Sequence, residues 1–279
     1  MLWGSLQSLF VLPRDLGAPG AFTPAGYRPL LPPPVGVVLN LAIAALFVWW
    51  WPLRVLGRRE WRRAAQFRMR PLAPAVRPSL VRAGLAIVVG ATASLLVLPR
   101  LLPFAPESDP LLGAYLRRPF GALALAVVAV LVAPMMEEFL FRGWVQRRLE
   151  RRFGRGRGAV PWAAIAATAL LFALVHWQRF GFVPRALFAV AAGYAAWAAR
   201  SIWASVALHA MYNGGLLVAT PLIGLLVPRL ADADDRSVAR LAEDPRVFWP
   251  ALVVLVLSGA AAAGALRGLR RAAAAPRGV

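Results

Sequence analysis

The sequence predicts an all-α, polytopic membrane protein, a bundle of about seven to eight transmembrane helices. Of the 279 residues, 60% are hydrophobic, and the mean hydropathy is +0.63. A soluble domain is usually about half apolar. The apolar residues also gather in runs that approach the roughly 20 residues needed to cross a bilayer. We therefore expect one integral membrane domain over residues 1–279.

Seven apolar runs are the predicted spans. In chain order they cover about Val35–Leu53, Gly84–Leu98, Phe120 to beyond Phe141, Pro161–Trp177, Pro184–Ala199, Ile202–Leu226 and Val247–Leu266. Three tryptophans, Trp49 to Trp51, close the first run as an aromatic belt at the interface. The sixth run contains Gly214, Gly215 and Pro221, which could break its helix.

The loops predict the orientation. All basic residues are arginines, and the net charge is +20. Residues 54–82 hold nine arginines against one acid, and residues 142–157 hold seven against one acid. By the positive-inside rule both loops are expected in the cytoplasm, which predicts a multi-pass protein of the cell (inner or plasma) membrane. The same rule accounts for the positive charge, so we expect the lipid bilayer and no nucleic acid as partner.

The composition also limits the chemistry. The chain has no cysteine, which excludes structural disulfides, thiolate metal sites and a cysteine nucleophile. Within the predicted spans the only acids are Glu137 and Glu138, and the only histidines of the chain are His176 and His209. An ionisable side chain in a bilayer costs about 2.5–3.5 kcal/mol on insertion scales. This small set is therefore expected to be functional.

Spacing organises these side chains. Glu138 and Arg142 are four residues apart, so they share a helix face and can form an ion pair. Glu137 is turned by about 100° from Glu138 and stays available for chemistry. Counting residues from the predicted turns places Glu137, His176 and His209 at a similar depth. We expect these three groups to meet in one layer of the bundle.

The residues allow two hydrolytic mechanisms, which the sequence does not separate. Glu137 can act as a general base on water, while a histidine or Asn213 donates to the oxyanion. Alternatively, Glu137, His176 and His209 could hold Zn²⁺ with an open position for water. Intramembrane glutamate and histidine also build proton relays, so a proton-coupled transporter is a rival interpretation.

Three motifs follow one another in the predicted helices: Glu137-Glu138-Phe-Leu-Phe-Arg142, Phe172-Ala-Leu-Val-His176 and His209-Ala-Met-Tyr-Asn213. Together they resemble the signature of the CPBP intramembrane proteases, the CAAX-protease and bacteriocin-processing (Abi) family. The resemblance covers about residues 120–217, which we take as a catalytic core. It implies a peptidase in which Glu137 activates the attacking water.

The resemblance also implies roles for the remaining residues. Glu138 with Arg142 would support Glu137, and Asn213 would serve the oxyanion. His176 and His209 would be metal ligands or stabilisers of the intermediate. Phe172 is expected to pack around the site at the substrate pocket.

The implied substrate is a peptide or protein in or at the membrane, for example a lipidated peptide. The resemblance does not identify that substrate further. Two alternatives from other functional classes remain: a non-catalytic membrane scaffold or bacteriocin-immunity protein, and the proton-coupled transporter.

Overall fold

The computed structural model describes residues 70–102, 126–153, 159–176, 180–226 and 240–275, together with residues 11–13, 27–29, 42 and 123. The predicted first span, residues 35–53, lies outside this part apart from Ala42. So do residues 54–69 of the first arginine-rich loop and most of the start of the third span, residues 120–125.

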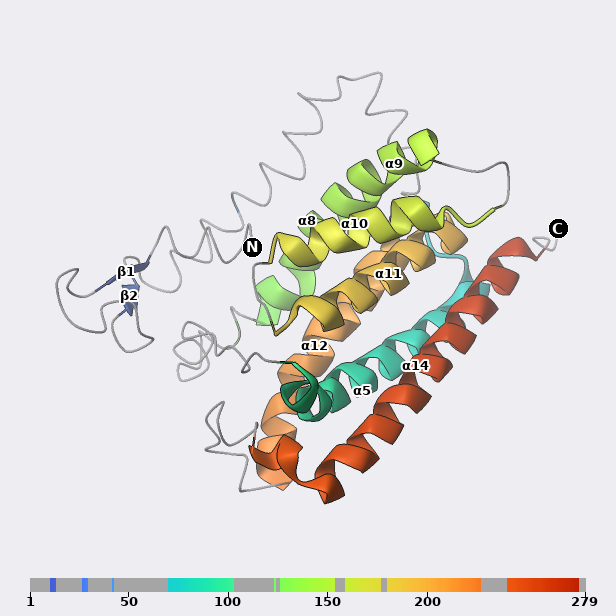
Figure 1. Ribbon diagram of the computed structural model, residues 1–279. Helices are drawn as coiled ribbons and strands as arrows, with labels where there is room; N and C mark the ends of the chain where they lie inside the picture. Colours follow the sequence, from blue (N-terminus) through green and yellow to red (C-terminus); the bar gives the residue numbers. More distant parts are fainter. Residues whose placement is uncertain are drawn as a thin grey trace.

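Helices dominate the described residues (Figure 1). They are η3 (Pro74–Val76), α5 (Arg77–Leu101), η4 (Val128–Val132), α8 (Ala133–Glu138), η5 (Phe139–Val145), α9 (Gln146–Phe153), α10 (Trp162–Leu174), α11 (Phe182–Ala199), α12 (Ile202–Leu226) and α14 (Pro245–Ala274). The predicted helical bundle is confirmed. One small departure is an antiparallel pair of three-residue strands, β1 (Val11–Pro13) and β2 (Tyr27–Pro29).

Four helical stretches are long and apolar enough to cross a membrane: Pro74–Leu101, Phe182–Ala199, Ile202–Ala219 and Pro245–Ala274. Helix α10 is apolar but shorter. Large apolar side chains such as Leu85, Leu187 and Val256 lie exposed on these helices, as expected for surfaces that face lipid rather than water. The chain is therefore a multi-pass membrane protein, and the count of seven spans stays a prediction.

Local sequence explains several helix ends. Asp244 caps α14, because its carboxylate accepts a hydrogen bond from the backbone N–H of Arg246 at 2.8 Å. Helix α11 ends at Arg200, which adopts the left-handed conformation (φ 51°) typical of helix C-termini. Ser201 then accepts from the N–H of Trp203 and donates to the carbonyl of Arg70 at 2.6 Å. The predicted boundary between the spans Pro184–Ala199 and Ile202–Leu226 is confirmed.

Helices α5 and α14 lie side by side and run antiparallel (Figure 1). Small residues allow the close approach: a Cβ on Gly90 would lie 2.6 Å from the Ser258 hydroxyl, and one on Gly268 would lie 3.2 Å from the Ser79 hydroxyl. Helix α12 packs against the other side of α5, and α10 and α11 pack against each other. The buried core of the bundle includes Phe141, Phe172, Phe188, Ala192 and Leu208.

The predicted break in the sixth span is wrong. Helix α12 continues from Ile202 to Leu226 through both glycines and Pro221. The glycines serve packing instead: a Cβ on Gly215 would lie 2.5 Å from Val88 of α5, and one on Gly214 would lie 3.5 Å from Val130.

Two further boundaries differ from the prediction. Helix α10 ends at Leu174 rather than at Trp177, because the N–H of His176 turns back to the carbonyl of Ala173 (3.3 Å). The predicted loop 142–157 is helical as far as Phe153. Its first arginine, Arg142, is fully buried. Arginine content alone cannot distinguish a loop from a helix that extends beyond the bilayer.

Candidate active site

The two acids lie where the helix changes its winding. Helix α8 ends at Glu138, and the π-helix η5 begins at Phe139. A second π-helix, η4, precedes α8. Such wider turns occur frequently at functional sites, because they redirect side chains and free backbone groups. The first motif therefore spans the junction of α8 and η5.

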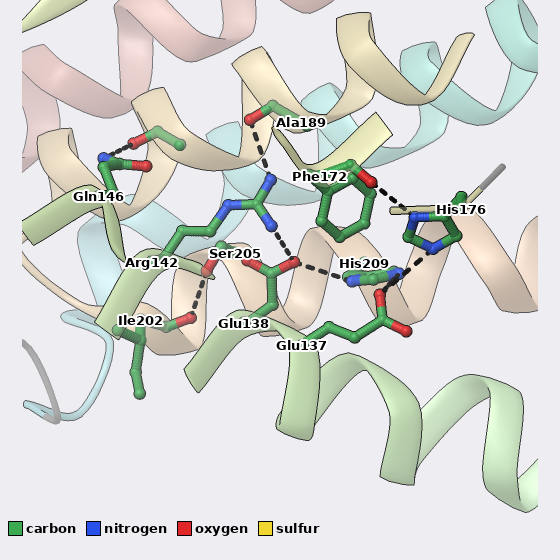
Figure 2. Close-up of polar contacts among 11 residues, drawn as sticks. Glu137, Glu138, Arg142, Gln146, Phe172, His176, Ala189, Ile202, Ser205 and His209 are labelled. Carbon is green, nitrogen blue, oxygen red and sulfur yellow. Dashed lines mark hydrogen bonds and ion pairs between the residues drawn. The ribbon is translucent and has the colours of Figure 1, made fainter. Parts of the chain in front are cut away.

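Glu138 is the centre of a buried polar network (Figure 2). Its Oε1 accepts hydrogen bonds from Arg142 Nη1 and from His209 Nδ1, both at 2.8 Å. Arg142 Nη2 also donates to the backbone carbonyl of Ala189 in α11 at 3.0 Å. The side chains of Glu138 and Arg142 are 0% exposed. The predicted ion pair is confirmed, and it compensates two charges that would be costly alone in an apolar interior.

Glu137 points to the two imidazoles instead (Figure 2). Its Oε2 lies 3.7 Å from His176 Nε2 and 3.9 Å from His209 Nε2. Glu137 and His176 are each 17% exposed, whereas Glu138 is sealed. The predicted meeting of these three side chains is confirmed. The accessible carboxylate is thus Glu137, and the paired carboxylate is Glu138.

The hydrogen-bond partners indicate where the imidazole protons lie. His176 Nδ1 is 2.7 Å from the carbonyl oxygen of Phe172, which can only accept, so Nδ1 carries the hydrogen. His209 Nδ1 likewise faces Glu138, a carboxylate already paired with Arg142. In the neutral ring each Nε2 then bears a lone pair. Two lone pairs therefore face the oxygen of Glu137.

Glu137 Oε2 is itself buried and receives no hydrogen bond from the part of the chain that the structure describes. Three acceptors facing one another repel unless a donor or a cation lies among them. A water molecule, an added proton or a metal ion would satisfy this need. The arrangement is therefore suited to binding a water molecule next to a carboxylate base.

Glu137, His176 and His209 are also the predicted ligands of a zinc ion. Two histidines and a glutamate are suitable zinc ligands, and the Glu138–His209 contact resembles the carboxylates that orient metal-bound histidines. However, across residues 70–102, 126–153, 159–176, 180–226 and 240–275, no group of three such residues is arranged to hold a metal ion. The separations of 3.7 and 3.9 Å exceed the roughly 3.3 Å between two ligands of a tetrahedral zinc ion. Zinc stays a prediction, and no chemical step below runs through it.

Asn213, the last residue of the third motif, makes a hydrogen bond between two helices. Its Nδ2 donates to the backbone carbonyl of Ala129 at 2.7 Å, which ties α12 to the π-helix η4. This bond uses one of the two amide hydrogens. The role at the oxyanion stays a prediction.

The ring of Phe172 packs against the side chains of this polar network. Its ring centroid lies 4.6 Å from that of His176 and 5.8 Å from that of His209. The Arg142 guanidinium lies over the same ring at 4.8 Å, at cation–π distance. Phe172 is buried, and its ring also packs against those of Phe141, at 5.1 Å between centroids, and Phe188, at 6.1 Å. Its role in the substrate pocket stays a prediction.

Two further polar residues, which the motifs do not include, lie close to this network. Gln146 lies one turn after Arg142 and is fully buried, and Ser205 lies one turn before His209 and is also buried. Ser205 donates to the carbonyl of Ile202 in its own helix (Figure 2). The available signal was spacing: each polar residue lies four positions from a motif residue, on the same helix face.

One comparison with known families gives a match. Residues 119–215 match the family model described as Rce1-like, Type II CAAX prenyl endopeptidase, in agreement with the resemblance to the CAAX-protease family. The matched segment contains all three motifs. No curated protein and no solved structure matches the chain significantly.

Proposed function

We propose that the Rce1-like segment, residues 119–215, is an intramembrane endopeptidase that hydrolyses a peptide bond of a membrane-associated or lipidated peptide. The observation that supports this proposal best is the division of labour between the two adjacent acids. Arg142 and His209 occupy Glu138, whereas Glu137 is partly accessible and faces two imidazole nitrogens. A carboxylate in such surroundings is suited to accept a proton from water.

In the proposed reaction, a water molecule donates a hydrogen bond to Glu137 and attacks the peptide carbonyl carbon. Glu137 takes one proton from the water as the new C–O bond forms. The C–N bond then breaks, and Glu137 returns that proton to the leaving amine. The products are a carboxylic acid and an amine, so one water is consumed for each bond cleaved. General acid–base catalysis of this kind contributes about 10²–10⁴-fold to the rate.

The histidines serve the water and the intermediate in this proposal. A bare Nε2 on His176 or His209 accepts the second hydrogen of the water and orients it. An imidazole that carries a second proton donates it as a hydrogen bond to the developing oxyanion. The amide hydrogen of Asn213 that Ala129 does not use is a further candidate donor.

The test is cleavage by the purified protein in detergent, with prenylated and membrane-anchored peptides as substrates. Glu137→Gln keeps the shape of the side chain but cannot take the proton, so product formation should fall by at least about 100-fold. Glu243→Gln is the matched control, because Glu243 is exposed and lies just before α14; this variant should cleave like the unchanged protein.

Two results would contradict the proposal. One is equal cleavage by Glu137→Gln and Glu243→Gln. The other is no product from any peptide with a folded protein, which would favour the non-catalytic scaffold. Substrate flux across sealed vesicles, lost in Glu137→Gln, would instead indicate the transporter.

A further inference from the structure

Gln146 makes two hydrogen bonds at the joint between α9 and α11. Its Nε2 donates to the carbonyl of Gly193 at 3.0 Å and to Glu150 Oε1 at 2.9 Å. Both partners can only accept, which fixes the orientation of the amide. The side chain is fully buried. An amide with two fixed partners in an apolar interior holds its backbone firmly in place.

This contact repeats the one made by Arg142. Arg142 donates to the carbonyl of Ala189, and Gln146 donates to the carbonyl of Gly193 (Figure 2 draws both side chains). The donors are four residues apart on one helix, and the acceptors are four residues apart on the other. A single contact would leave the segment free to rotate about it, whereas two contacts one turn apart fix its rotation.

Gly193 leaves the room that this joint needs. A Cβ at this position would lie 2.7 Å from Gln146 Oε1 and 3.2 Å from the Ile165 side chain. Any larger residue would push the amide away from the carbonyl that it binds. The glycine and the glutamine therefore form one unit of the joint.

We propose that Gln146 is a positioning residue for the active site: with Arg142 it fixes the rotation of the η5–α9 segment against α11 and so keeps Glu138 in place under His209. This inference rests on the proposed peptidase function, because it concerns the geometry of that site. Arg142 reaches Glu138 and Ala189 at once only for a narrow range of rotations. Glu138 in turn fixes the His209 ring, whose Nε2 faces Glu137.

The first test needs no substrate. The chain has two histidines, so selective ¹⁵N-histidine labelling gives two imidazole spin systems by NMR in detergent. Gln146→Leu removes both donated bonds, and the His209 nitrogen signals should shift as its contact with Glu138 loosens. The His176 signals should stay, because that ring is held by the Phe172 carbonyl of its own segment. Gly193→Ala should cause the same shift from the other side of the joint.

The matched control is Thr168→Val. It also removes a buried bond to a backbone carbonyl, that of Ala164 at 2.8 Å, but this bond lies within α10. It should move neither histidine. The proposal is overturned if His209 is unmoved in both Gln146→Leu and Gly193→Ala. It is also overturned if Thr168→Val shifts the signals as they do, because the effect is then general loosening.

The second test uses cleavage. Gln146→Leu should lower kcat by about 10–100-fold with little change in KM, as for residues that orient a site residue from behind. In a Glu138→Gln background the same change should have no further effect, because Gln146 acts through Glu138. Full additivity of the two substitutions would overturn the proposal. If the unchanged protein cleaves nothing, the peptidase function fails, while the NMR result still decides the role of Gln146.

Discussion

Two helix contacts in this bundle are built on different principles. The η5–α9 segment binds α11 through polar side chains that donate to backbone carbonyls, at Ala189 and Gly193. The α5–α14 pair instead relies on small residues, with Gly90 against Ser258. The first contact depends on the direction of its hydrogen bonds and on the charge of Arg142. The second contact depends on the small volume of its side chains.

The two contacts should tolerate amino-acid substitution to different degrees. In an apolar medium a buried charge or donor must keep its partner, because no water replaces it. A contact between small residues can relax by small backbone and side-chain shifts, so the loss of stability increases gradually with the size of the added group. We therefore expect the η5–α9 and α11 side of the bundle, which holds the candidate site, to respond sharply to substitution and the α5–α14 side to respond in small steps.

The largest expected effect is that of Arg142→Met. It leaves Glu138 buried without its cation, which should lower the free energy of unfolding by about 3–5 kcal/mol. The matched control is Arg82→Met, because Arg82 is exposed and its bond to the Ser79 hydroxyl is long at 3.4 Å, so its loss should matter by at most about 1 kcal/mol. Thermal unfolding in detergent compares the two. Equal unfolding temperatures for the two variants would show that burial does not increase the contribution of the Glu138–Arg142 pair to stability.

Substitutions of the two histidines should have similar effects on activity but different effects on stability. Replacement of either by phenylalanine should lower kcat by about 100-fold, since both face Glu137. His209→Phe should also lower the unfolding temperature, because it removes a buried partner of Glu138. His176→Phe should leave it nearly unchanged, because His176 binds only the Phe172 carbonyl among the hydrogen-bond partners described. Equal loss of stability in both variants would contradict this separation.

A substitution at the contact between α5 and α14 should cause a smaller loss of stability. Gly90→Ala places a Cβ 2.6 Å from the Ser258 hydroxyl and should cost at least about 1 kcal/mol in the free energy of unfolding. Gly259→Ala is the control, because nothing lies within 4 Å of its Cβ position. Adding Ser258→Ala to Gly90→Ala should restore stability, since the remaining Cβ is at an ordinary 3.5 Å. Persisting destabilisation in that double variant would locate the strain elsewhere.

Much of this organisation was predictable because its signals are strong in the sequence. Long apolar runs predicted the bundle, and rare ionisable residues within them predicted side chains that meet in its interior. Spacing of four residues predicted the Glu138–Arg142 pair, and counting from the turns brought Glu137 and both histidines together. These inferences depend only on helical geometry, which varies little.

The remaining features depend on information that hydropathy does not carry. The π-helices η4 and η5 widen the helix by one residue per turn, a change without a composition signal. The carbonyls of Ala129 and Ala189 accept buried hydrogen bonds, but a backbone acceptor leaves no mark in the sequence. Gly215 looked like a helix breaker, although it only makes room for Val88. Tertiary packing decided each of these cases.

The smallest expected effect concerns metal. Because Glu137 activates the water directly in the reaction that we propose, that reaction predicts cleavage that survives exhaustive chelation, whereas a zinc site predicts its loss. The measurement is the cleavage rate before and after treatment with a zinc chelator, with metal content determined by mass spectrometry on the same samples. Glu137→Gln with and without added zinc is the control for cleavage that does not depend on this site. Loss of activity on chelation, restored by stoichiometric zinc, would show that the three side chains close around a metal, and the polar side of the bundle would then owe its arrangement to that ion as well as to Arg142.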